Sequence, residues 1–365
     1  MVIAQGQSAT GSVFITGGQL SVTNQGVSLG TFGTGQLSVT IAGFGVGQMT
    51  VSNGSLLAQS VIVADCENSQ GTLTIAGGAV AVASNVTVGA HAYIGVYTNA
   101  NASGAIQMTS GSLTVTNQSA AGQLVIGQNG TATFLQSGGT ATVDQLLVTN
   151  GTSSVFSLNS GLFNTRATAV SNAQTFFVGD GADPATYHLL AGIHSFANGV
   201  EVRSNAVLSG CGTINGAVLV DPGGLVQADC GGTLTFTGIV TNNGELVAAN
   251  GSTVESYGLV VNDGVINIIN GNTNFHAGFI NNGVVLTSNV VPQIISITAV
   301  GSNIEVQFTT ASNLTYVLEY TGNLLTGSWL PLAGFSGPGG DVTVTDFNAI
   351  LQTQRFYRIH LVVPP

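Results

Sequence analysis

The chain contains very little charge. Only 5% of its 365 residues are Asp, Glu, Lys or Arg, whereas about a quarter is usual in globular domains. There is no lysine, and the four cations are Arg166, Arg203, Arg355 and Arg358. The formal net charge is −11. Nucleic acids and anionic lipid surfaces are bound through clustered cations, so we expect no nucleic-acid partner and no attraction to such a surface.

Other features are missing as well. No apolar run reaches the length of a membrane-spanning helix, and no amphipathic helical repeat is present, so we expect no membrane insertion. The chain has no P-loop and no Cys-x-x-Cys pair. With so few ionisable groups, an acid–base active site is hard to build. We therefore predict that the protein is not an enzyme and has no catalytic residue and no cofactor.

The best polar cluster lies between residues 178 and 194. It contains Asp180, Asp183, His188 and His194. Asp180 and Asp183 are the candidates for a Ca²⁺ site on a loop, but Asp-Gly-Ala-Asp-Pro is also an ordinary turn sequence. The segment lacks the ligand count of an EF-hand and the repeated Asp of calcium-binding β-rolls. We predict no metal site and keep these two aspartates as its candidates.

The chain is rich in glycine and in apolar residues. It has 52 glycines and 44% hydrophobic residues, with many Thr, Ser and Asn, a composition typical of short strands separated by turns. The triplets Asn242–Gly244, Asn262–Gly264 and Asn281–Gly283 recur at a nearly constant spacing, and we assign them to tight corners. A period of about 20 residues that holds two or three short apolar runs predicts a β-solenoid.

A second repeated signature is Gly-x-Leu-x-Val. It occurs, with Met or Ile as variants, in Gly18–Val22, Gly35–Val39, Gly47–Val51, Gly71–Ile75 and Gly111–Val115. Its alternation predicts Leu and Val on an interior face and Ser, Thr or Gln on the outside. A hairpin-rich sandwich would alternate in the same way. The regular spacing and the Asn-Gly corners in register favour the solenoid.

The segments Leu208–Gly216, Gly223–Leu225 and Gly232–Phe236 resemble the Gly-rich strand repeats of bacterial autotransporter passengers. The resemblance covers roughly residues 10–290. It implies a right-handed parallel β-helix that is exported and often displayed on the cell surface. We therefore predict an all-β chain with a solenoid domain over residues 1–290.

The repeat pattern of the sequence stops at Val290–Gln293. Six strand-like segments follow within residues 291–365, which predicts a small β-sandwich. The series from Tyr316 through Trp329 to Arg358 resembles C-terminal fibronectin- or immunoglobulin-like modules of secreted proteins from environmental bacteria such as the Verrucomicrobia. Capping, sorting and binding are the roles that this resemblance implies.

Several side chains of this module carry specific expectations. We expect Trp329 to pack in the core, with a sugar-binding platform as the alternative. Arg355 and Arg358 are expected to pair with Glu319 or Asp346.

Two of the three cysteines predict a disulfide. Cys211 and Cys230 are separated in the sequence by about one coil of the repeat. Residues stacked in successive coils have Cα atoms about 4.8 Å apart, a distance that a disulfide spans. The absence of Cys-x-x-Cys and the scattered histidines argue against a redox motif or a zinc site. For Cys66 we consider a free thiol at a turn and, as the alternative, a contact between subunits.

The expected location is extracellular. A disulfide and the absence of lysine both favour it. The start of the chain, MVIAQGQSATGSVFITGG, lacks the basic and apolar segments of a signal peptide, and we expect that such a peptide was removed.

The predicted function is structural. A solenoid has unpaired strand edges at both ends, and this chain reaches strand-like residues at once, in Val13–Ile15, without a capping helix. We predict head-to-tail assembly with other copies of the chain into a fibre of a cell-surface or biofilm matrix. Either Met1–Gln5 or His360–Pro365 is expected to add a strand to a neighbour.

Two other functions are considered. One is a monomeric adhesin or carbohydrate-binding protein whose C-terminal module reads a cell-surface or matrix polysaccharide. The other is a polysaccharide-active enzyme, because parallel β-helices include such enzymes.

Overall fold

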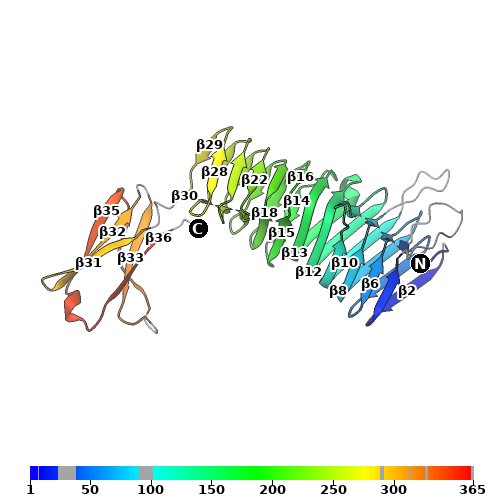
Figure 1. Cartoon of the computed structure of the whole chain (residues 1–365), viewed down its shortest axis with the longest axis horizontal. Helices are drawn as coiled ribbons and strands as arrows, with labels where there is room; N and C mark the ends of the chain where they lie inside the picture. Colours follow the sequence, from blue (N-terminus) through cyan, green and yellow to red (C-terminus); the bar gives the residue numbers. More distant parts are fainter. Residues whose placement is uncertain are drawn as a thin grey trace.

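The computed structural model describes residues 1–6, 8–23, 38–89, 102–287, 292–311, 314–324 and 328–362. Most of these residues belong to β-strands, which are joined by turns (Figure 1). The described chain contains no α-helix, only two short 3₁₀ segments, η1 (Gly151–Ser153) and η2 (Ala349–Leu351). The first part is a parallel β-solenoid and the second is a small antiparallel module, so the predicted fold class is confirmed.

The solenoid has three faces, and each face is a parallel sheet built from successive coils. The first face contains β1 (Val2–Ile3), β4 (Ser38–Ile41), β7 (Ser60–Val63), β9 (Asn85–Val88), β11 (Gln123–Ile126), the ends of β12 (Thr131–Val148) and β13 (Ser154–Val170), β16 (Ile193–Phe196), β19 (Gly212–Asn215), β22 (Thr233–Phe236), β25 (Thr253–Ser256) and β28 (Asn272–Phe275). Each strand pairs with strands one coil away, so the ladder hydrogen bonds run along the solenoid axis.

The second face follows the first around each coil. It contains β2 (Thr10–Ile15), β5 (Val46–Val51), the beginnings of β8 (Gln70–Val82), β10 (Ser103–Val115), β12 and β13, then β14 (Phe176–Val178), β17 (Val200–Val202), β20 (Val218–Val220), β23 (Val240–Asn242), β26 (Val260–Asn262) and β29 (Phe279–Asn281). Val240 pairs with Val260 and Val260 with Phe279, which is the spacing that the Asn-Gly repeat predicts.

The third face completes the coil. It contains β3 (Gln19–Val22), β6 (Ser55–Ala58), the ends of β8 and β10, the middle parts of β12 and β13, then β15 (Ala185–Leu189), β18 (Ala206–Gly210), β21 (Leu225–Ala228), β24 (Glu245–Ala248), β27 (Val265–Asn267) and β30 (Val284–Leu286). Leu208, Val226 and Leu246 form one of its buried inward columns.

Coils in the N-terminal half of the solenoid are longer and less regular. Met49 pairs with Leu73, and Leu73 pairs with Ile106, so each of these partners lies farther along the chain than in the later coils. The long strands β8, β10, β12 and β13 each pass from one face to the next. The looser spacing of the early sequence therefore reflects longer coils.

The Gly-x-Leu-x-Val signature marks a strand, and it recurs on all three faces. Val39 belongs to the first face, Val51 to the second and Val115 to the third, and all three side chains are buried. The predicted alternation of interior and exterior residues is confirmed.

A glycine allows one of the corners inside a long strand. β12 bends from the second face to the third at Gly138 and Gly139. Gly139 has a φ of +75°, and a Cβ atom there would lie 2.6 Å from the carbonyl oxygen of Gly111 in the preceding coil. No other residue type fits without strain.

Aromatic rings fill the middle of the solenoid. Phe134, Phe156 and Phe176 stack in one column of the second face, with ring centroids 5.0 and 5.1 Å apart. Phe163 packs edge-on against Phe156 at 5.0 Å and stacks on Tyr187 at 5.4 Å. Their burial contributes a large share of the hydrophobic stabilisation, because each ring removes much apolar area from water.

The C-terminal module is a β-sandwich of two three-stranded antiparallel sheets. One sheet contains β31 (Ile294–Val300), β32 (Asn303–Thr310) and β35 (Gly340–Asp346); the other contains β34 (Leu330–Ser336), β33 (Thr315–Thr321) and β36 (Phe356–Val362). Val306 and Phe308 of the first sheet and Leu318 of the second meet in one core. All six predicted strands are present.

The predicted domain boundary between residues 290 and 291 lies outside the described residues, as do residues 363–365 of the C-terminal segment expected to pair with a neighbour. The last described strand of the solenoid ends at Leu286, and the first strand of the module begins at Ile294.

Candidate functional site

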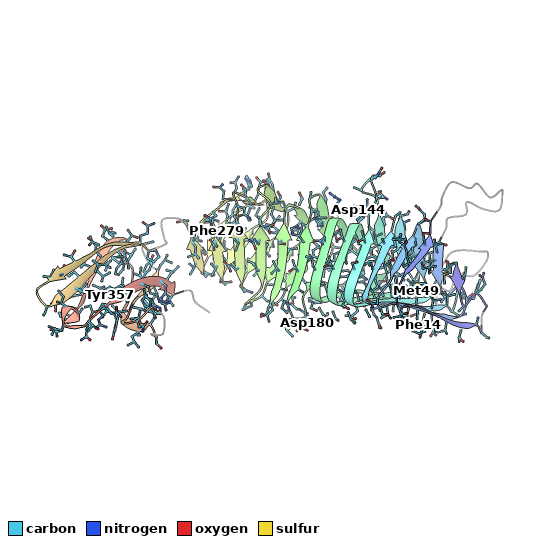
Figure 2. The ribbon with its side chains drawn as sticks, turned by 60° about the horizontal axis from the view of Figure 1, so that its bottom comes forward. Phe14, Met49, Asp144, Asp180, Phe279 and Tyr357 are labelled. Atoms are coloured by element: carbon cyan, nitrogen blue, oxygen red, sulfur yellow. A yellow bond between two sulfur atoms is a disulfide. The ribbon has the colours of Figure 1, made fainter. Side chains whose placement is uncertain are left out.

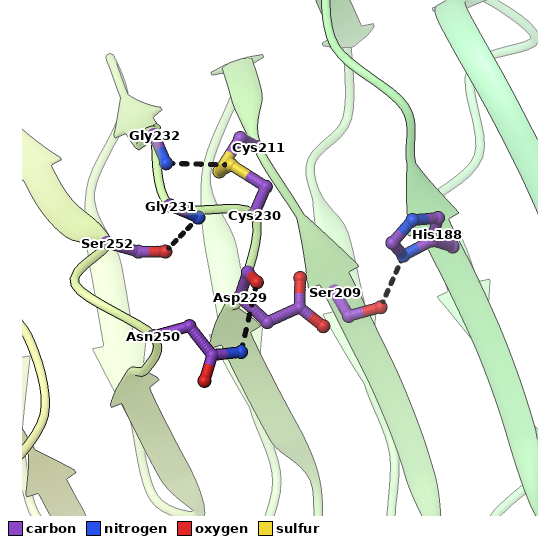
Figure 3. Close-up of a disulfide and its surroundings, with 9 residues drawn as sticks. All are labelled: His188, Ser209, Cys211, Asp229, Cys230, Gly231, Gly232, Asn250 and Ser252. Carbon is purple, nitrogen blue, oxygen red and sulfur yellow. Dashed lines mark hydrogen bonds between the residues drawn. A yellow bond between two sulfur atoms is a disulfide. The ribbon is translucent and has the colours of Figure 1, made fainter.

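Cys211 and Cys230 form the predicted disulfide (Figure 3). They lie in successive coils at the corner that joins the third face to the first, and their Cα atoms are 6.0 Å apart. The backbone N–H of Gly232 donates to Cys230 Sγ at 3.1 Å, and that of Gly231 donates to Ser252 Oγ at 2.9 Å. The disulfide therefore joins this corner to the preceding coil, and the Gly231–Ser252 hydrogen bond joins it to the following coil.

The two Cα atoms are farther apart than simple stacking predicts. Leu208 pairs with Val226 on the third face before the corner, and Thr213 pairs with Thr235 on the first face after it. The connection from Val226 to Thr235 is longer than the connection from Leu208 to Thr213. Cys230 therefore lies in an enlarged turn.

Cys66 is a free thiol, and its side chain is buried. Burial, followed by the negative charge of Asp65, raises the pKa of Cys66 to about 11. Because the thiolate is the reactive form, this residue is chemically quiet in the folded chain.

The two candidate calcium ligands lie in the turn between β14 and β15. Asp180 Oδ1 accepts hydrogen bonds from the backbone N–H of Ala182 at 2.9 Å and of Asp183 at 3.1 Å. These two bonds hold the pKa of Asp180 below its usual range. One carboxylate oxygen is thus engaged in closing the turn. Among the described residues, no three His, Cys, Asp or Glu side chains are grouped closely enough to hold a metal ion.

The structure separates the two histidines of this cluster from the aspartates and from each other. His188 lies on the outer side of the third face, where Nδ1 contacts Ser209 Oγ at 2.8 Å. His194 lies on the first face and points into the core, where it is completely buried. No common site is formed.

His194 belongs to a buried polar network. Its Nε2 donates to the carbonyl oxygen of Ala191 at 2.8 Å, so Nδ1 accepts from the Thr168 hydroxyl at 2.9 Å. The Thr168 oxygen also bonds the Tyr187 hydroxyl at 2.6 Å. Burial lowers the pKa of His194 to about 4, which keeps the ring neutral at physiological pH.

In the module, the predicted ion pairs form. Arg355 Nε lies 3.3 Å from Asp346 Oδ2, and Arg358 Nε lies 2.5 Å from Glu319 Oε2. Trp329 is half-buried and lies outside the hydrophobic core, contrary to expectation. The Arg358 guanidinium carbon lies 4.4 Å from the Trp329 ring centre, so a cation occupies one face of the proposed sugar platform.

The two ends of the solenoid present the edges of its three sheets. In the described chain, β1, β2 and β3 pair only with strands of the next coil, and β28, β29 and β30 only with strands of the preceding coil. Phe14, at the first coil, is 68% exposed, and Phe279, at the last, is 41% exposed; Figure 2 shows them at opposite ends. Among the described strands, each face therefore begins and ends with a strand that is paired on one side only.

An asparagine ladder leads to the C-terminal end. Asn242 Nδ2 donates to Asn262 Oδ1 at 2.7 Å and to the carbonyl oxygen of Val265 at 2.9 Å. Asn262 Nδ2 repeats this with Asn281 Oδ1 at 2.6 Å and the carbonyl oxygen of Val284 at 3.4 Å. Asn242 and Asn262 are completely buried, whereas Asn281 is exposed.

The Asn-Gly repeat predicts corners for these asparagines, which is wrong for the first residue of each triplet. The repeat itself was the available signal. An Asn that recurs at the coil period can form a side-chain ladder as well as a turn.

The first and last coils of the solenoid contain no Asp, Glu, Lys or Arg. No Asp, Glu, Lys or Arg precedes Asp65, and none lies between Asp263 and Glu305. Exposed strand edges are normally protected from pairing by charged side chains, Lys above all. These edges carry no such protection.

No protein-family model, curated protein or solved structure matches the chain. The resemblance to autotransporter passengers thus rests on the repeat residues, and its coarser content, a β-solenoid, is what the structure shows. None of the described helical segments is long and apolar enough to cross a membrane.

Proposed function

We propose that the protein is an extracellular structural subunit that stacks head to tail into a fibre of a surface or biofilm matrix. The observation that supports this is that the solenoid begins and ends at the same point of the coil. The first, second and third faces begin with β1, β2 and β3 and end with β28, β29 and β30. A second copy can therefore continue all three sheets at once, one coil beyond the last.

The asparagine ladder provides a specific contact across this junction. Asn242 and Asn262 each donate to the carbonyl of the residue that begins the third-face strand of the next coil. In a stacked neighbour that residue is Gln19, the first residue of β3. Asn281 would donate to the Gln19 carbonyl. This hydrogen bond needs only the backbone carbonyl of Gln19 as its acceptor. It therefore forms even though β2 offers no asparagine side chain to continue the ladder.

Burial and electrostatics favour the same contact. Stacking would cover Phe279, whose ring packs against Phe275 at 5.1 Å and is otherwise open to water. The first and last coils carry no Asp, Glu, Lys or Arg of their own, so they add no like-charged pair at the junction to the net charge of −11. The disulfide supports an oxidising location outside the cytosol.

The test is negative-stain electron microscopy of the purified chain across a concentration series at neutral pH. The wild type should form fibres of uniform width. Asn281→Asp replaces the amide donor with a carboxylate that faces the Gln19 carbonyl, and this variant should remain as short rods. Asn198→Asp is the matched control, because Asn198 is exposed at a corner of an inner coil; it should assemble as the wild type does.

Two results would reject the proposal. One is discrete rods of the wild type at every concentration. The other is Asn281→Asp fibres that match those of the wild type, because the junction would then not involve this end.

A further inference from the structure

A column of polar and aromatic side chains crosses five coils on the outside of the solenoid, at the corner between the first and second faces. It contains Ser195, Asn215, Thr237, Tyr257 and His276, which we call the outer column. Asn215 Nδ2 donates to Ser195 Oγ at 3.2 Å, and Thr237 Oγ1 donates to Asn215 Oδ1 at 3.0 Å. These bonds hold the three short side chains as an ordered polar floor.

The column ends in an aromatic wall. The rings of Tyr257 and His276 are parallel to within 6°, with centroids 4.5 Å apart. His276 Nε2 lies 2.9 Å from Glu255 Oε1, which fixes the orientation of the imidazole. Tyr257 is 54% exposed. His276 covers one face of its ring, and the shorter Thr237 stands one coil away on the other side.

A groove extends the floor away from the wall. Its volume is about 350 Å³, and its lining includes Ser195, Asn215, Val170, Phe196 and Ala197. The side chains of Val170 and Phe196 are buried in the core, so the exposed apolar lining beside the two hydrogen-bonding side chains comes from Ala169 and Ala197. An apolar concavity with a few fixed polar groups is the usual form of a small-ligand site.

We propose that the outer column binds a neutral saccharide chain of two or three sugar units, one ring of which packs on the face of Tyr257 that His276 leaves uncovered. A pyranose ring presents apolar C–H groups that pack against an aromatic face such as that of Tyr257. Its hydroxyls donate and accept, as the floor of Thr237, Asn215 and Ser195 requires.

The charges select a neutral ligand. None of the four arginines lies on the outer column, and Glu255 places a carboxylate beside the aromatic wall. An acidic sugar would meet repulsion without a compensating cation. This inference does not depend on fibre formation, since the column runs along the side of the solenoid and only its final member, His276, lies in the last coil.

The experiment titrates the Asn281→Asp chain, which keeps the outer column intact whether or not fibres form. The probes are cellotetraose and mannotetraose, with trigalacturonate as the acidic comparison, and binding is followed by titration calorimetry. A neutral tetrasaccharide should bind, and Tyr257→Ala should weaken it about tenfold. Phe14→Ala, which removes another exposed ring, is the control and should leave the affinity unchanged.

Three outcomes would overturn the proposal. They are the absence of binding by both neutral tetrasaccharides, a preference for trigalacturonate, and an unchanged affinity of Tyr257→Ala. Because Tyr257 is exposed, its truncation should leave the thermal unfolding of the chain in place, which separates a lost contact from a lost fold.

Discussion

Acid should weaken the middle of the solenoid through one residue, His194. The fold accepts only the neutral ring, because the imidazole is completely buried and its two nitrogens are committed to Ala191 and Thr168. An unfolded histidine takes up a proton near pH 6.5, whereas the buried ring does so only near pH 4. Between these values the unfolded state binds more protons, so stability falls as the pH falls.

The size of the effect follows from the two pKa values. Each pKa unit corresponds to about 1.36 kcal/mol, so the fall from 6.5 to about 4 corresponds to about 3 kcal/mol of stability. This contribution is fully present above pH 6.5 and is lost as the pH approaches 4. It is large beside the 5–15 kcal/mol or so by which domains are usually stable.

The assay compares urea unfolding at pH 7 and pH 4 for the wild type and for His194→Gln. Glutamine keeps an acceptor for Thr168 and a donor for Ala191 but does not titrate, so the variant should lose about 3 kcal/mol less than the wild type on acidification. Phe196→Leu, a nearby core change without a titrating group, should follow the wild type. Parallel pH dependence of the wild type and His194→Gln would refute the reasoning.

Three further predictions concern the disulfide, the free thiol and a corner. Replacing Cys211 and Cys230 together by serine should lower the free energy of unfolding by about 3 kcal/mol in a chain-entropy model, measured by urea titration; an unchanged midpoint would contradict the staple. Cys66 should react with Ellman's reagent at pH 8 only after unfolding in urea, and rapid labelling of the native chain would contradict its burial. Gly139→Ala should cost about 1–3 kcal/mol in thermal unfolding, whereas Gly17→Ala, in open space, should be nearly neutral.

The fold could be predicted because the same physical rule acts in every coil. Alternation of apolar and polar residues, with Gly or Asn at the corners, fixes which side of each strand faces the core. Cys211 and Cys230 could be paired for the same reason, since a known period converts sequence distance into spatial distance. The six strands of the module could be predicted in the same way, from the alternation of their apolar and polar residues.

The number of strands in a coil could not be predicted. Gly-x-Leu-x-Val marks any strand that buries two side chains, so the segments ending at Val39, Val51 and Val115 look alike although they lie on three different faces. Only the pairing between distant strands distinguishes the faces, and no local pattern encodes it.

The direction of individual polar side chains was also beyond the sequence. His194 and Asn242 point inward because hydrogen bonds to Thr168 and Asn262 compensate for their burial. Such compensation depends on residues of a neighbouring coil, which share a column only once the coils are stacked. The outer column at Tyr257 was missed for the same reason, since its members are spread over five coils.

The orientation of the ladder hydrogen bonds has a mechanical consequence. Because they run along the solenoid axis, a force that pulls the two ends apart would open the coils one after another. A coil of about 20 residues adds only about 4.8 Å to the folded length but about 70 Å when extended. Each opened coil would therefore lengthen the molecule many-fold before the backbone itself is strained. The segment closed by Cys211 and Cys230 would be withheld from this extension until the bond is reduced, so the redox state of the surroundings would set how far a single molecule can stretch.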